Sequence, residues 1–170
     1  MKFASQPMTL GHASKISRWA YEPPYDFYNM DTSDESINEL LSGAYRIVQS
    51  SSEVYGFYCV GESAQVPSGH EAGAYLSQRN VVDLGIGMRP EFTGQGLGSK
   101  FLAHVLCQIV SDCPCANVRL TVATFNKRAI RLYERFGFRP VSEFVHAGVT
   151  FQVMTRPTED LPPEQEWSLR

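Results

Sequence analysis

The sequence lacks long apolar runs and an excess of positive charge. No stretch approaches the roughly 20 apolar residues of a membrane-spanning helix, and residues 1–7 lack the apolar core of a secretory signal. Lys and Arg together number 15 against 18 Asp and Glu, a net charge of −3, so no basic field is present to attract nucleic acid. We therefore expect a cytoplasmic protein whose partners include neither a membrane nor a nucleic acid.

Cysteine and histidine are scarce, and their spacing does not match metal or nucleophilic sites. The chain has four of each. Cys113 and Cys115 are too close together for a zinc knuckle, and no second closely spaced pair completes a site. No histidine stands in a motif that would activate a cysteine. We expect neither a metal site nor a cysteine nucleophile.

The chain does contain an apolar strand that leads through a glycine-rich loop into a helix. Residues 81–88 read as the strand, glycines occupy positions 94, 96 and 98, and an apolar helical pattern begins at Leu97. Alternate glycines let the backbone approach a ligand, and the first N–H groups of a helix attract anions. A dinucleotide fingerprint would need glycine where Ser99 stands, and a Walker loop would need lysine directly after Gly98. The loop is either a plain connection or a phosphate site of another kind.

A second strand and helix help to decide between a plain connection and a phosphate site. Val118, Leu120 and Val122 alternate as a strand, and Asn126 is a good N-cap for the helix that follows. Gly137 suits the left-handed position just beyond the end of that helix. The segment therefore has the order strand, cap, helix and glycine stop.

Together the two segments resemble the GCN5-related N-acetyltransferase (GNAT) superfamily. The stretch from Leu84 to Ser99 resembles the acetyl-CoA motif, and that from Asn126 to Phe138 resembles the segment Asn-x-x-Ala-x-x-Leu-Tyr-x-x-x-Gly-Phe. The resemblance implies an α+β, GNAT-like fold with a central mixed sheet of about seven strands and about four flanking helices. It implies acetyl-CoA as co-substrate, held by Ile86, Met88, Thr93, Gly94, Gln95, Gly96, Leu97, Gly98, Ser99 and Asn126. Thr93 departs from the family pattern, which has Arg or Gln there.

Two side chains are candidates for proton transfer. By the same resemblance Tyr133 would protonate the CoA thiolate, and a core aromatic is the alternative. Asp83 shares a strand face with Gly85 and Gly87, a face cleared for a ligand or another backbone, and is the candidate base. A solvated or salt-bridged aspartate is the alternative there, because the family more often places its acid at the positions of Leu84 or Gly85.

Residues 19–30 combine five aromatic side chains with two prolines and two carboxylates. The Pro23-Pro24 pair excludes a continuous helix. A cationic amine is well held by aromatic faces and carboxylates, so we predict that Trp19, Glu22, Tyr25 and Asp26 bind the acceptor. An aromatic mini-core is the alternative.

The chain is predicted to form one domain over residues 1–156, followed by a Pro- and acid-rich tail over residues 157–170. The hypothesis for its function is transfer of an acetyl group from acetyl-CoA to a primary amine of a small molecule or peptide. An acyl-CoA-binding module without turnover is the alternative, and a homodimer is left open. Apart from the two motif segments, the expected elements are strands near residues 3–4, 44–49, 54–60, 141–146 and 150–155, helices after Thr9 and Ser33, and a long loop over residues 63–79.

Overall fold

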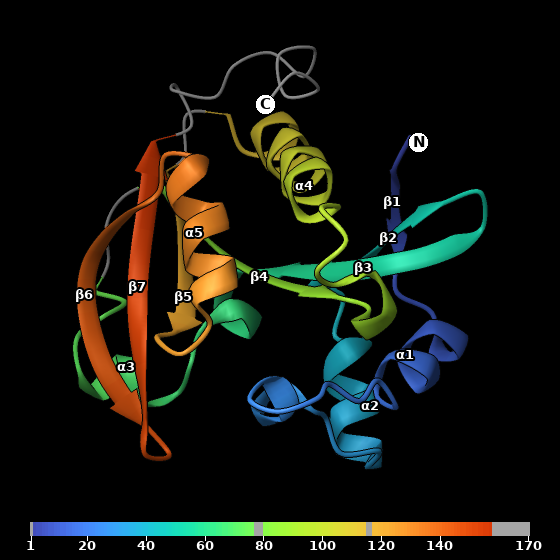
Figure 1. The fold of residues 1–170 in the computed structure, drawn as a ribbon, viewed down its shortest axis with the longest axis horizontal. Coiled ribbons are helices and arrows are strands. Elements are labelled where there is room, and N and C mark those ends of the chain that lie inside the picture. Colours follow the sequence, from blue (N-terminus) through green and yellow to red (C-terminus); the bar gives the residue numbers. More distant parts are fainter. Residues whose placement is uncertain (1, 77–79, 115–116, 158–170) are drawn as a thin grey trace. The chain divides into compact units, whose positions relative to one another are not determined.

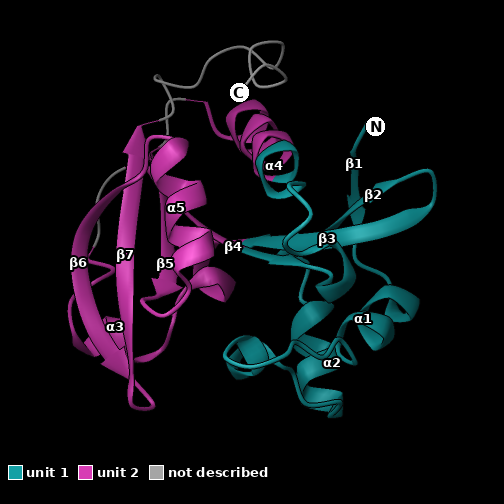
Figure 2. Cartoon of the chain, viewed as in Figure 1, with its two compact units in different colours: residues 1–59, 86–101 teal, residues 60–85, 102–170 magenta. Residues whose placement is uncertain are grey.

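The computed structural model describes residues 2–76, 80–114 and 117–157 and is shown in Figure 1. These residues divide into two compact units (Figure 2). Unit 1 comprises residues 1–59 and 86–101, and unit 2 comprises residues 60–85 and 102–170. Cys115 and almost all of the expected tail, including Trp167, lie outside the described residues. Within the described part of the chain, no helix is long and apolar enough to span a membrane.

Seven strands form one mixed sheet in the order β1-β2-β3-β4-β5-β7-β6. Strand β4 pairs in parallel with β5 through residues 81–83 against residues 117–119, while β5 and β6 are each antiparallel to β7. Strand β4 (Val81–Met88) and helix α4 (Gly98–Asp112) both begin in one unit and end in the other. The predicted GNAT-like fold class, an α+β arrangement of about seven strands, is confirmed. The implied separation of the parallel strands around a pantetheine arm stays a prediction.

Local capping explains where the helices of unit 1 begin. The Thr9 hydroxyl accepts from the His12 N–H to start α1 (Leu10–Ile16), and the Ser33 hydroxyl accepts from the Ser36 N–H to start α2 (Asp34–Leu40). Strands β1 (Ala4–Pro7), β2 (Tyr45–Ser50) and β3 (Glu53–Val60) form an antiparallel meander. The turn between β2 and β3 contains two serines at positive φ, as a tight hairpin requires.

Unit 2 packs its remaining elements around an apolar core. These are α3 (Ser68–Glu71), β5 (Asn117–Ala123), α5 (Lys127–Arg135), β6 (Arg139–His146) and β7 (Val149–Pro157). Helix α5 ends as predicted, because Gly137 adopts φ +83° directly after its C-cap. The buried side chains of this core include Leu102, Leu106, Val118, Phe138 and Val153.

Three local features add to or correct the expectations from the sequence. The long loop over residues 63–79 is interrupted by a 3-10 turn, η2 (Gly61–Ala64), and by α3. The aromatic segment contains a further 3-10 turn, η1 (Tyr25–Tyr28), after a cis Pro23-Pro24 bond. Of the two alternatives for the space beside Gly87, a ligand or a neighbouring strand, the structure favours the strand, because a Cβ there would lie 2.5 Å from the Phe57 ring of β3. Gly87 therefore serves packing between neighbouring strands.

Candidate active site

The glycine loop (residues 89–97) lies in unit 1 between β4 and α4. Gly94 and Gly96 adopt φ values of +75° and +77°, which L side chains rarely adopt. A Cβ built on Gly96 would meet no atom within 4 Å, so its backbone borders open space. The first backbone bond of α4 runs from the Phe101 N–H to the Leu97 carbonyl. Helix α4 therefore begins directly after the loop, and the N-terminus of a helix attracts anions.

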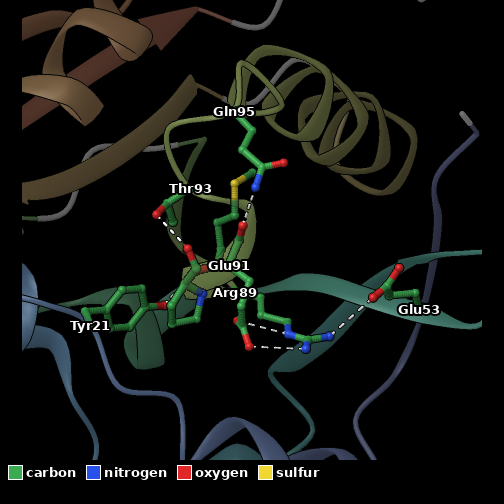
Figure 3. Close-up of polar contacts among 8 residues, drawn as sticks. Tyr21, Glu53, Arg89, Glu91, Thr93 and Gln95 are labelled. Carbon is green, nitrogen blue, oxygen red and sulfur yellow. Dashed lines mark hydrogen bonds and ion pairs between the residues drawn. The ribbon is translucent and has the colours of Figure 1, made fainter.

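Two polar side chains of the loop are used to hold the loop itself (Figure 3). The Thr93 hydroxyl donates to the Pro90 carbonyl at 2.8 Å and closes the 3-10 turn η3 (Pro90–Phe92). The Gln95 amide donates to the Glu91 carbonyl at 2.6 Å. Because both donors are directed into the loop, its backbone is the better source of contacts to a phosphate.

Arg89 braces the start of this loop against β3. Its guanidinium contacts Glu91 at 3.1 Å and Glu53 at 3.5 Å, and its backbone N–H donates to the Tyr55 carbonyl at 2.9 Å. The hydrogen bonds with Glu91 raise the pKa of Arg89, and those with Arg89 lower the pKa of Glu91. The Arg89 charge is therefore already matched by carboxylates. Arg89 therefore does not substitute for the Arg or Gln that the family pattern has at the position of Thr93.

The end of β4 is fastened by a residue from the aromatic segment. The Tyr21 hydroxyl donates to the Met88 carbonyl at 2.9 Å (Figure 3). Ile86 and Met88 are half-buried at the end of this strand. The family resemblance implies that Ile86 and Met88 hold the cofactor, and the Met88 carbonyl already accepts a hydrogen bond from Tyr21.

The predicted acceptor residues are brought into the same unit as the glycine loop. Trp19 is half-buried, with its ring centroid 6.0 Å from that of Phe57. Tyr25 is half-buried, whereas Glu22 and Asp26 are exposed. Trp19 therefore has a packing role in unit 1, and the two carboxylates are open to a cation.

In unit 2 the predicted base forms a buried ion pair. Asp83 and Arg119 are neighbours across the parallel β4 and β5 strands and are 7% and 5% exposed. Arg119 Nε lies 2.6 Å from Asp83 Oδ1, and Nη2 lies 2.8 Å from Oδ2. This bidentate contact raises the pKa of Arg119. A carboxylate whose two oxygens both accept from a guanidinium is poorly placed to take a proton.

Further polar groups complete the surroundings of this pair. The Gln65 amide donates to Asp83 Oδ2 at 2.7 Å. The Arg119 guanidinium lies 5.1 Å from the centre of the Tyr75 ring, and the Tyr75 hydroxyl is 2.9 Å from the Thr121 hydroxyl. The charges are thus compensated by a network from the residue after η2, the two strands and the segment after α3. We interpret the network as structural, and the role of Asp83 as base is left to experiment.

The second motif places Asn126 and Tyr133 on helix α5. Asn126 Oδ1 accepts from the Ala129 N–H at 3.1 Å, so its predicted capping role is confirmed. Tyr133 is 7% exposed, and its ring lies 5.9 Å from that of Phe138. The ring therefore packs in the core of unit 2, as the alternative reading held. A role in proton transfer would be additional to this packing.

The comparisons with known proteins agree with this geometry. The family model described as Acetyltransferase (GNAT) family matches residues 13–138, which include both motifs and the aromatic segment. The chain belongs to the GNAT family. The predicted family is thereby confirmed.

Individual relatives match this GNAT chain either over a short segment or at low sequence identity. Thialysine N-epsilon-acetyltransferase from Sus scrofa is 38% identical over 65 residues, which are 38% of each chain. The match thus spans well under half of that relative's length. Spermidine/spermine N-acetyltransferase SpeG from Vibrio cholerae has a similar fold, with a TM-score of 0.66, 18% identity and coverage of 94% of this chain and 97% of that one. Aminoglycoside acetyltransferase AAC(6')-Ib in complex with coenzyme A gives a TM-score of 0.70, 15% identity and coverage of 93% and 96%.

The sequence alone did not predict the structural roles of three residues of the GNAT chain. Tyr21 and Arg89 fasten the glycine loop, and Arg119 neutralises Asp83. A signal for the last pair was present, because Asp83 and Arg119 are each the one charged residue of a mainly apolar strand and buried charges occur in pairs. No comparable signal marks Tyr21, since its partner is a backbone carbonyl 67 residues away along the chain.

Proposed function

We propose that this GNAT protein transfers an acetyl group from acetyl-CoA to a primary amine. The observation that carries the proposal is the glycine loop, where two glycines at positive φ lead into the N-terminus of α4 and a Cβ at Gly96 would point into open space. Backbone N–H groups and a helix N-terminus suit a pyrophosphate. Family membership and relatives named as acetyltransferases support the same chemistry.

Most of the proposed contacts to acetyl-CoA come from backbone groups. We propose that the N–H groups from Gly94 to Ser99 hold the pyrophosphate, with Ile86 and Met88 supplying contacts at the end of β4. Thr93 and Gln95 would act by shaping the loop, because their side chains bond to Pro90 and Glu91. Acetyl-CoA supplies the activated acetyl group as a thioester.

Two residues of unit 2 complete the proposal. Asn126 would add an amide contact to the cofactor while it caps α5. Tyr133 would donate a proton to the departing thiolate as the acceptor nitrogen forms its bond to the acetyl carbon. The acceptor proton would leave through water or another base, because Asp83 is held by Arg119.

We propose a cationic amine as acceptor. Glu22 and Asp26 are exposed carboxylates in a segment rich in aromatic rings, which together suit an ammonium group. Relatives are named for thialysine, spermidine or spermine, and aminoglycosides, and these compounds all carry amino groups. The choice among them belongs to loops that differ between members of a fold family.

The experiment is a thiol-release assay with acetyl-CoA and a panel of amines comprising thialysine, spermidine, an aminoglycoside and a lysine-containing peptide. We expect amine-dependent release of free CoA, with mass spectrometry showing one added acetyl group on the amine. Reactions without amine measure background hydrolysis. Binding of CoA without release for any amine would instead favour the binding module that lacks turnover.

A further inference from the structure

Within the aromatic segment (residues 19–30), hydrogen bonds join Tyr21 to Asn29. The Tyr21 N–H donates to Asn29 Oδ1 at 2.7 Å, and Asn29 Nδ2 contacts the Tyr21 carbonyl at 3.5 Å. Between these two residues lie the Pro23-Pro24 bend and the η1 turn. Residues 21–29 therefore form a loop whose two ends are joined by hydrogen bonds.

This closed loop is attached to the end of β4 in two ways. The polar attachment is the hydrogen bond from the Tyr21 hydroxyl to the Met88 carbonyl (Figure 3). The apolar attachment is Trp19, which packs on Phe57. The Phe57 ring in turn fills the space that a Cβ on Gly87 would need. Met88 and Gly87 are the last residues of β4, immediately before the glycine loop.

The glycine loop begins one residue beyond the Tyr21 contact. Arg89 follows Met88 directly and carries the contacts to Glu53 and Glu91, and the Glu91 carbonyl accepts from Gln95. A continuous chain of contacts thus runs from the aromatic segment through the end of β4 to the turn that precedes α4. All of these contacts lie within unit 1.

We propose that Tyr21 is a positioning residue that couples the aromatic segment to the glycine loop, so that binding of CoA at the loop orders residues 19–30. This inference rests on the proposed function for the location of the cofactor. Because coupling between two sites is reciprocal, order in the segment also strengthens binding of CoA. Loss of one hydrogen bond of this kind weakens CoA binding by about three- to tenfold.

The test uses CoA as the ligand and the full chain with Tyr21→Phe, which keeps the ring and removes the hydroxyl. Hydrogen exchange of residues 19–30 and CoA affinity by calorimetry are measured together. In the parent protein, saturating CoA slows exchange in residues 19–30. In Tyr21→Phe the Kd for CoA rises by about three- to tenfold and the slowing is lost even at saturation.

A matched control and a second variant separate coupling from general loss of structure. Tyr28→Phe removes a hydroxyl from the same segment and keeps the ring that packs edge-on against Phe27, and we expect it to retain the CoA response. Asn29→Ala opens the closed loop without touching Met88, and we expect it to reduce the response as Tyr21→Phe does. Emission of Trp19 in a Trp167→Phe background reports the same ordering, because the chain has two tryptophans.

The outcomes distinguish the two proposals. If CoA binds both parent and Tyr21→Phe and slows exchange of residues 19–30 equally in each, coupling through Tyr21 is overturned while the proposed function stands. If CoA does not bind the folded parent protein, the proposed function fails at its first step, and this inference fails with it.

Discussion

Replacement of Asp83 by Asn tests whether this residue acts mainly as an ion-pair partner or as a base. The side chain keeps its size but loses the charge that faces the buried Arg119 guanidinium at 2.6 Å. Removing one partner of a buried ion pair costs about 3–5 kcal/mol, since the other charge is left uncompensated. With a shift of roughly 2–4 °C per kcal/mol for a chain of this size, we expect Tm to fall by about 10 °C.

The assay combines urea unfolding with turnover measured per folded molecule. As an ion-pair partner, Asp83→Asn lowers the urea midpoint while kcat at low temperature stays within a few-fold of the parent. As a general base, its loss would lower kcat by about 10²–10⁴-fold. Parental stability together with a collapse of kcat would refute the structural interpretation.

A double variant supplies the control for this prediction. Arg119→Met alone leaves the Asp83 carboxylate buried without its cation and is expected to be as destabilising as Asp83→Asn. Asp83→Leu combined with Arg119→Met removes both charges and is expected to cost much less stability than the sum of Asp83→Leu alone and Arg119→Met alone. Additive losses in the double variant would contradict a direct interaction between the two residues.

Three further changes test other parts of the structure. Gly56→Ala places a Cβ 2.4 Å from the Gly87 carbonyl oxygen and 2.7 Å from the Phe101 ring. The free energy of unfolding, measured by urea titration, should therefore fall by about 1–3 kcal/mol. The control Gly11→Ala in α1 meets no close atom and should be neutral or stabilising in the same titration. Tyr133→Phe keeps the ring that packs on Phe138 and should lower kcat with little change in CoA affinity, and unchanged turnover with a rate-limiting chemical step would refute the proton-donor role. Glu22→Gln with Asp26→Asn should raise the KM for a cationic amine far more than that for acetyl-CoA, and steady-state kinetics with unchanged KM values would place the acceptor elsewhere.

Much of the secondary structure followed from the sequence because its signals are local. Thr9, Ser33 and Asn126 cap their helices through bonds to N–H groups three residues ahead. Gly137 likewise marks the end of α5 through its positive φ. These features depend on a few neighbouring residues, so a single sequence carries them.

The contacts that surround the candidate site were harder to predict because they depend on strand register. The pairing of Asp83 with Arg119 requires knowing that residues 81–83 lie beside residues 117–119. The role of Gly87 likewise depends on which ring of β3 lies against it, and here Phe57 occupies the space that the sequence left for a ligand or another backbone. The bond from Tyr21 to Met88 ends on a backbone carbonyl, which no side-chain pattern reveals.

The most direct test of the central claim, that the glycine loop holds the pyrophosphate of CoA, is the thermal shift produced by CoA in Gly96→Glu. The parent should gain about 2.7 kcal/mol of stability at a CoA concentration 100 times its Kd. Glutamate places a negative charge in the open space beside Gly96, so the CoA-dependent rise in Tm should disappear relative to that variant's own baseline. Gly96→Asn, which tolerates positive φ without adding charge, should retain part of the shift. An equal rise in Tm for Gly96→Glu and the parent would contradict the account.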